Sequence, residues 1–148
     1  MELQSDFKEL LGLLNAHGVE YLIVGGYALA FHGAPRFTGD LDIFIKTSPV
    51  NAGKVHAALN EFGFDSVGLK PEDFAAADQV IQLGVPPVRI DFVTSIDGVK
   101  WEDAWTGRVP GTYAGVPVQF LGRTEFLQNK KVSGRLKDLA DIEALGEE

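Results

Sequence analysis

The 148-residue sequence contains no cysteine. This absence excludes disulfide bonds, thiolate zinc sites and a cysteine nucleophile, and it makes the cytosol the expected compartment. No run of 18 or more apolar residues is present, and the opening residues MELQSD lack the basic start and apolar segment of a secretory signal. We therefore expect a cytoplasmic protein that does not interact with membranes.

Positive charge is also scarce. Thirteen Lys and Arg residues against 21 Asp and Glu residues give a net charge of −8. The whole molecule should therefore repel a nucleic-acid backbone unless its basic residues cluster or a metal ion bridges the two. No His-x-x-x-His pair is present for zinc, and we assign no catalytic histidine. The length and the apolar content of 45% predict a single globular domain over residues 1–148.

Hydrophobic periodicity predicts an alternation of helices and strands. A helix is predicted near the N-terminus, where four apolar residues from Phe7 to Leu14 follow helical spacing, and a buried strand at 21–24 leads through Gly25 and Gly26 into a helix that ends near residue 32. We further expect strands at 40–45, 80–83, 88–93 and 116–121, and helices at 49–62, 124–131 and 135–145. This order predicts an α/β (α+β) fold with a mixed β-sheet flanked by helices and a C-terminal helical pair.

Three carboxylates stand out within the predicted strands. Asp40 and Asp42 are two residues apart, so their side chains project to the same face of the strand. Asp91 lies between Ile90 and Phe92, and a charge in such an apolar strand is costly unless it has a partner or a metal. Three carboxylates suit Mg²⁺, which prefers oxygen ligands. The alternative is a structural role in which Asp91 pairs with Arg89 on the same strand face or with a helix N-terminus.

A phosphate-binding turn is expected next to these carboxylates. Gly25 and Gly26 allow backbone N–H groups to approach a phosphate closely, and the helix that follows adds partial positive charge. Arg36 could bind phosphate with two hydrogen bonds or brace its loop against a carboxylate. Thr38 is in the same loop, where a hydrogen bond within a turn is the simpler role.

Together these motifs resemble those of the nucleotidyltransferase superfamily, in which a Gly-Gly or Gly-Ser turn is followed by Asp-x-Asp and by a later single Asp. The stretch from VGGYA to HGAPRFTGDLD, residues 24–42, looks like the AbiEii/AbiGii toxin-type and related minimal nucleotidyltransferases. The ending NKKVSGRLKDLAD, residues 129–141, is similar to the tail of that group. The resemblance implies a nucleotidyltransferase fold and transfer of a nucleoside monophosphate from a nucleoside triphosphate to a hydroxyl.

The resemblance also implies a set of site residues. Asp40, Asp42 and Asp91 would be catalytic and would bind Mg²⁺ or Mn²⁺. Lys130 would be catalytic and would meet the triphosphate of the substrate. The expected nucleotide-binding set is Gly25, Gly26, Arg36, Thr38, Lys130, Lys137 and Asp138.

The functional hypothesis has two forms, which differ in the molecule that accepts the nucleotide. In a toxin-like protein it is RNA, such as the end of a transfer RNA, drawn to the basic segment between Lys130 and Lys137. In a resistance-like protein it is a small hydroxylated or cationic molecule such as an antibiotic, which an acidic surface attracts. The alternative from another class is a catalytically silent nucleotide-binding protein, or the partner protein of a two-component defence or toxin–antitoxin system with a cognate antitoxin.

Overall fold

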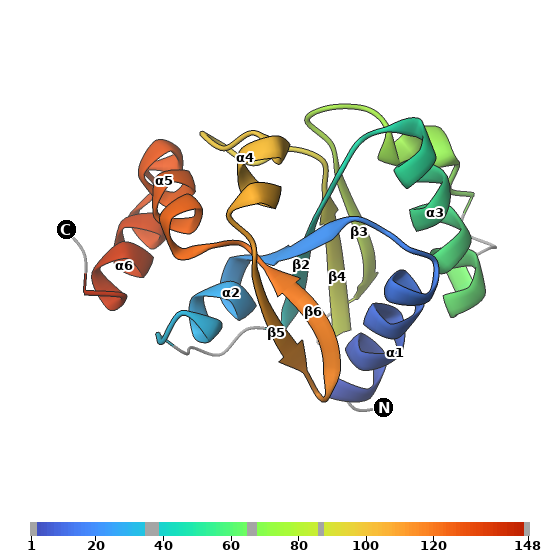
Figure 1. Cartoon of the computed structure of the whole chain (residues 1–148), viewed down its shortest axis with the longest axis horizontal. Helices are drawn as coiled ribbons and strands as arrows, with labels where there is room; N and C mark the ends of the chain where they lie inside the picture. Colours follow the sequence, from blue (N-terminus) through green and yellow to red (C-terminus); the bar gives the residue numbers. More distant parts are fainter. Residues whose placement is uncertain (1–2, 35–38, 65–67, 86–87, 147–148) are drawn as a thin grey trace.

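The computed structural model describes residues 3–34, 39–64, 68–85 and 88–146. Within these ranges it has the strands β1 (Tyr21–Val24), β2 (Asp40–Ile45), β3 (Val80–Val85), β4 (Val88–Val93), β5 (Val109–Tyr113) and β6 (Val116–Phe120). They form a sheet in the order β3-β4-β2-β1-β6-β5, shown in Figure 1. The pairs β2/β4 and β1/β6 are parallel and the other neighbours are antiparallel, which confirms the predicted mixed sheet.

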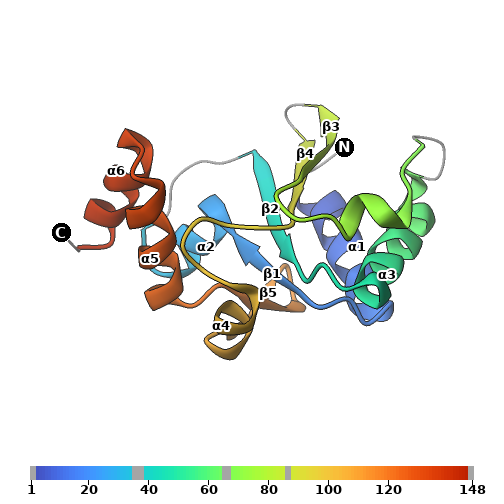
Figure 2. The ribbon, with the colours of Figure 1, turned by 90° about the horizontal axis from the view of Figure 1, so that it is seen from above.

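Helices flank this sheet. They are α1 (Leu3–Ala16), α2 (Gly25–Phe31), α3 (Pro49–Leu59), α4 (Trp101–Thr106), α5 (Arg123–Ser133) and α6 (Leu136–Ala144). Figures 1 and 2 show α1 beside α3 at one end of the molecule and the predicted C-terminal pair, α5 and α6, at the other. No helix within the described residues is long and apolar enough to cross a membrane.

The apolar pattern of the sequence accounts for the core. In α1, Phe7, Leu10, Leu11 and Leu14 form the expected stripe, and all four are fully buried. α3 begins where the Ser48 hydroxyl accepts a hydrogen bond from the Asn51 backbone N–H at 3.2 Å. Local sequence signals therefore fix both the buried face of α1 and the start of α3.

The alternation in β2 separates the core from the candidate site. Leu41, Ile43 and Ile45 have no exposed surface, whereas the residues between them project to the opposite face. Asp40 and Asp42 are therefore held on the far side of the sheet from these three core residues. The rigid strand fixes the two carboxylates in position relative to β1 and β4.

Some elements differ from the sequence-based expectation. The pattern does not predict β5, because its sequence VPGTY contains a proline and a glycine, which strands disfavour. β5 lies at the edge of the sheet, where a missing backbone N–H is tolerated. The helix predicted at 49–62 ends at Leu59 and continues as a π-helical turn, Asn60–Phe64, in which Gly63 has a φ of 115°. β3 extends through Gly84 and Val85, which were expected in the turn.

Candidate active site

A pocket of about 450 Å³ lies where β1 ends and α2 begins. Its lining combines Gly25, Gly26 and Asp42 from the first third of the chain with Lys130 and Lys137 from the C-terminal helical pair. These segments are more than 80 residues apart in the sequence. The fold thus brings the glycine turn, an acidic strand and the basic end of the chain around one space.

Strand register places the three predicted carboxylates on one face of the sheet. In the parallel pair of β2 and β4, Asp42 lies opposite Asp91, and Asp40 lies opposite Arg89. Residues opposite each other on neighbouring strands project to the same face. Asp91 is 7% exposed, so its carboxylate lies beneath the surface next to Asp42. The pairing of β2 with β4 brings Asp91 beside Asp42, and the role of Asp91 as a metal ligand stays a prediction.

Arg89 contacts two of the three carboxylates. Its Nη2 donates to Asp40 Oδ2 at 2.9 Å and to Asp91 Oδ2 at 3.4 Å. Its Nε lies 3.4 Å from Asp91 Oδ1. The pairing of Asp91 with Arg89, the alternative that the sequence leaves open, is therefore present in the structure, and Arg89 pairs at shorter distance with Asp40.

Burial and crowding change the proton affinity of the carboxylates. Burial raises the pKa of Asp42 to about 6, and the charges of Asp91 and Asp40 add to this rise, while Lys137 and Lys130 oppose it. Burial also raises the pKa of Asp91, with Arg89 opposing the shift. Burial thus disfavours the charged forms of Asp42 and Asp91. A bound cation would favour these charged forms.

Asp42 and Asp91 fit a hard divalent cation. Both offer carboxylate oxygens, and Asp91 Oδ1 is a buried atom without a hydrogen-bond partner among the described residues. In the same described part of the chain, no three His, Cys, Asp or Glu side chains are already grouped closely enough to hold a metal ion. Asp40 is paired with Arg89 at this point. Of the three predicted metal ligands, Asp42 and Asp91 thus suit a cation in their present arrangement.

Gly25 lies directly against Asp42. Its φ is +67°, a left-handed conformation that glycine adopts without strain, and a Cβ atom at this position would overlap Asp42 Oδ2. The register of β1 and β2, with Val24 opposite Asp42, produces this close approach. Glycine is therefore required at position 25 for two reasons: the left-handed backbone conformation, and the close approach of the Asp42 side chain.

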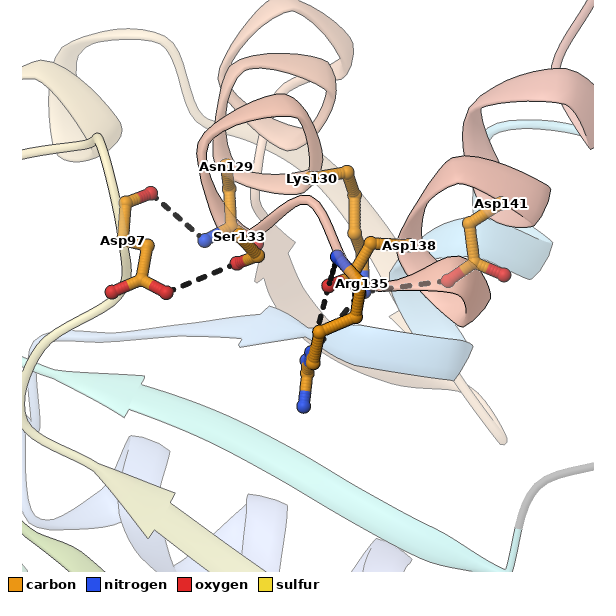
Figure 3. A network of polar contacts seen from close by, with 7 residues as sticks. All are labelled: Asp97, Asn129, Lys130, Ser133, Arg135, Asp138 and Asp141. Carbon is orange, nitrogen blue, oxygen red and sulfur yellow. Dashed lines mark hydrogen bonds and ion pairs between the residues drawn. The ribbon is translucent and has the colours of Figure 1, made fainter.

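Lys130 is held by two aspartates, as Figure 3 shows. Its Nζ lies 3.3 Å from Asp138 Oδ1 and 3.3 Å from Asp141 Oδ2, and the residue is only 6% exposed. Its positive charge nevertheless acts on Asp42, where it opposes part of the rise in pKa that burial causes. Contact between Lys130 and a triphosphate stays a prediction, because its ammonium group already faces Asp138 and Asp141.

Asp138 is fully buried and joins Lys130 to Arg135. Its Oδ2 accepts a hydrogen bond from Arg135 Nε at 2.8 Å (Figure 3). Burial alone would raise the pKa of Asp138, but the hydrogen bonds from Arg135 and the charge of Lys130 outweigh burial, so the pKa is lowered. The predicted nucleotide-binding role of Asp138 stays a prediction, and the observed contacts make it a support for Arg135.

Polar residues that the sequence did not single out also line the pocket. Asn129 Nδ2 donates to the backbone oxygen of Asp97 at 2.9 Å, and Ser133 Oγ donates to Asp97 Oδ2 at 3.1 Å (Figure 3). These bonds tie the segment after β4 to α5. The spacing of four residues between Asn129 and Ser133 places both on one helix face and was the available signal.

Arg36 and Thr38, the remaining predicted nucleotide-binding residues, lie outside the described residues. The pocket lining is therefore described without the loop that precedes Asp40. Their roles stay predictions.

Comparison with known proteins finds a likeness in the fold of the chain. No protein family model matches the chain. No curated protein matches it either. The crystal structure of a protein from Thermotoga maritima, described as a "putative nucleotidyltransferase", is similar, with a TM-score of 0.60 over 93% of this chain and 88% of that chain. The two share 15% sequence identity, so the likeness concerns the fold. We conclude that this chain has a nucleotidyltransferase-like fold.

Proposed function

We propose that this protein is a metal-dependent nucleotidyltransferase that moves a nucleoside monophosphate from a nucleoside triphosphate to a hydroxyl group. The observation that carries the proposal is the pair formed by Asp42 and Asp91, which lies against the Gly25 turn. The basic residues of α5 and α6 line the same pocket as Asp42. The nucleotidyltransferase-like fold supports the same conclusion.

Each part of the pocket has a role in this proposal. Gly25 and Gly26 let the backbone approach the phosphates without a side chain in between. Asp42 and Asp91, joined by Asp40, would hold Mg²⁺ or Mn²⁺, which neutralises phosphate charge and orients the attacking hydroxyl. Lys137 lines the pocket and has no ion-pair partner within the described ranges, so its charge is available to the triphosphate.

Two acceptor classes are supported by different surfaces. Lys131 of α5, Arg135 between the two helices and Lys137 of α6 are all exposed, which supports RNA as the acceptor, such as a transfer RNA end, as in a toxin of the AbiEii/AbiGii type. A cognate antitoxin would then be a further partner. The net charge of −8 supports instead a small hydroxylated or cationic acceptor.

One observation favours a second candidate, a catalytically silent nucleotide-binding protein. Asp40 is paired with Arg89, so the described structure contains no ready three-carboxylate metal site. Such a protein would bind the triphosphate in the same pocket without transferring it. The partner of a two-component defence system belongs to this class.

Label transfer distinguishes the two candidates. Purified protein is incubated with Mg²⁺, each α-phosphate-labelled nucleoside triphosphate, and either total RNA or a set of hydroxylated small molecules. We expect wild-type protein to label one acceptor class and the Asp42→Asn variant to label neither. Asp103→Asn, an exposed carboxylate on α4, is the matched control and should retain transfer. Nucleotide binding without transfer by the wild type would favour the silent protein.

A further inference from the structure

We propose that Arg89 acts as an internal counter-ion that withholds Asp40 from the metal site until a divalent cation displaces it. The inference rests on the proposed function, because it concerns how the same carboxylates acquire their cation. Asp42 and Asp91 would form the entry site for the first cation. Asp40 would join them when the guanidinium of Arg89 moves away.

The contacts of Arg89 are those of a substitute cation. Its Nη2 lies 2.9 Å from Asp40 and 3.4 Å from Asp91, so one guanidinium spans two of the three predicted ligands. Asp42 also lines the pocket, and in the part of the chain that the structure describes it forms no ion pair with Arg89. A positive charge thus already stands among carboxylates that a metal ion would otherwise draw together.

The fit of Arg89 to Asp91 is incomplete. Arg89 Nε and Asp91 Oδ1 are 3.4 Å apart, and within the described part of the chain both are buried atoms without a hydrogen-bond partner. An Arg–carboxylate pair with ideal geometry would use both atoms in a bidentate contact. Arg89 therefore compensates the charge of Asp91 without a hydrogen bond to Asp91 Oδ1, and this oxygen could be offered to a cation.

The surroundings of Arg89 allow it to leave. Its side chain is 31% exposed and that of Asp40 is 38% exposed, so their ion pair lies at the surface, where such pairs contribute little stability. On the opposite side, the residue paired with Arg89 across β3 and β4 is Gly84, which has no side chain to confine the guanidinium. The long arginine side chain can thus move toward solvent while its backbone remains in β4.

The test is direct binding of Mn²⁺, without nucleotide, to wild-type protein and to Arg89→Gln at pH 8. Calorimetry gives the dissociation constant, and the paramagnetic signal of free Mn²⁺ gives an independent value. We expect Arg89→Gln to bind Mn²⁺ about tenfold more tightly, because a competing charge a few ångströms from the ligands is removed. Arg89→Lys, which keeps a positive charge, should bind like the wild type. Arg108→Gln removes an arginine charge that stacks on Trp105 elsewhere and should leave the affinity unchanged.

A double-mutant cycle tests whether Asp40 carries the effect. In the Asp40→Asn background, the additional change Arg89→Gln should improve Mn²⁺ binding by less than about threefold, because no withheld ligand remains to be released. Thermal unfolding in the presence of a chelator identifies variants that fail to fold. If Arg89→Gln does not fold, Arg89→Met, which also removes the positive charge, replaces it in the cycle.

The outcomes separate this inference from the proposed function. Equal or weaker binding by Arg89→Gln, with measurable binding by the wild type, would overturn the inference and leave the metal site in place. An equal gain in the Asp40→Asn background would overturn the role of Asp40. If neither wild type nor Arg89→Gln binds Mn²⁺, both the inference and the metal-dependent function fail.

Discussion

At the scale of single residues, the contact between Gly25 and Asp42 gives the sharpest prediction. Gly25→Ala should lower the free energy of unfolding by about 2–4 kcal/mol, because it combines a left-handed backbone with steric overlap at Asp42. Gly18 has nearly the same φ, +69°, but its Cβ would meet only Lys54 Nζ at 3.8 Å. Gly18→Ala should therefore cost only the backbone strain, about 1 kcal/mol.

Urea denaturation of the two alanine variants makes this comparison. The difference between their unfolding free energies measures the overlap with Asp42 alone, because the backbone conformations match. The double variant with Asp42→Ala should recover most of the stability lost in Gly25→Ala. Equal losses at Gly18 and Gly25 would contradict the close approach of the turn to the acidic strand.

The raised pKa of Asp42 predicts how stability depends on pH in the absence of metal. Since burial raises this pKa to about 6 in the folded protein, the folded state binds a proton that the unfolded chain has already lost. The carboxylate therefore lowers stability progressively as the pH rises from about 4 through 6. Asp42→Asn should be more stable than wild type by about 1–3 kcal/mol at pH 8 and equally stable at pH 4.

Denaturation curves at several pH values in a chelator test this expectation. Asp103→Asn, which replaces an exposed carboxylate, should follow the wild-type pH profile within about 0.5 kcal/mol. An Asp42→Asn protein that is less stable than wild type at pH 8 would show that the carboxylate is compensated in the folded state.

The sequence predicts the acidic face of the sheet and offers the pairing of Asp91 with Arg89, but it does not predict the pairing of Arg89 with Asp40. Alternation in 40–45 and 88–93 is a local signal, and it correctly places Asp42 and Asp91 on strands that can lie together. The register that sets Arg89 opposite Asp40 depends on pairing between segments 49 residues apart. No local pattern contains that information, so the shorter bond of Arg89 to Asp40 could not be predicted.

At the scale of elements, the C-terminal helical pair depends on a buried ion-pair network. Lys130→Met should destabilise the protein by about 2–4 kcal/mol, since it leaves the buried carboxylates of Asp138 and Asp141 without their shared ammonium group. Lys131→Met changes the neighbouring, exposed lysine and should shift stability by less than about 0.5 kcal/mol. Thermal and urea denaturation of both variants provide the measurement. Similar stabilities would show that the network contributes little.

This network also explains why the orientation of α6 escapes sequence analysis. Apolar residues of a surface helix normally face the core, yet Leu136 is 87% exposed and Leu139 is 49% exposed. Asp138 and Asp141 face inward together with Ile142, and both carboxylates lie against the buried Lys130 of α5. The existence and approximate bounds of the helix were predictable, whereas the inward direction of its two aspartates depends on a charge on another helix.

At the scale of the whole molecule, the lysines that line the pocket lie in a protein whose net charge is negative, which repels an anionic nucleotide. Lys137→Gln should weaken binding of Mg²⁺–ATP about three- to tenfold, since it removes a pocket charge from a chain of net charge −8. Lys131→Gln makes the same change in net charge on a residue outside the pocket lining. Its binding should differ from wild type by less than about twofold, as measured by calorimetry. Equal losses in the two variants would indicate a general charge effect.

The salt dependence of the same binding gives a second measurement. Raising the ionic strength from about 0.05 M to 0.2 M should weaken ATP binding to the wild type more than to Lys137→Gln, because part of the screened attraction is already missing in the variant. A parallel decline in both proteins would place Lys137 away from the phosphates.

Because ion pairs hold α6 against α5, we expect this end of the molecule to open locally more often than the sheet. α6 contacts α5 more extensively than any strand, and both its buried carboxylates serve Lys130. Backbone amides of α6 should therefore exchange with deuterium sooner than those of β1 and β2 in a hydrogen-exchange measurement. Since α5 and α6 supply one wall of the pocket, such partial opening would widen the entrance while the central strands stay intact.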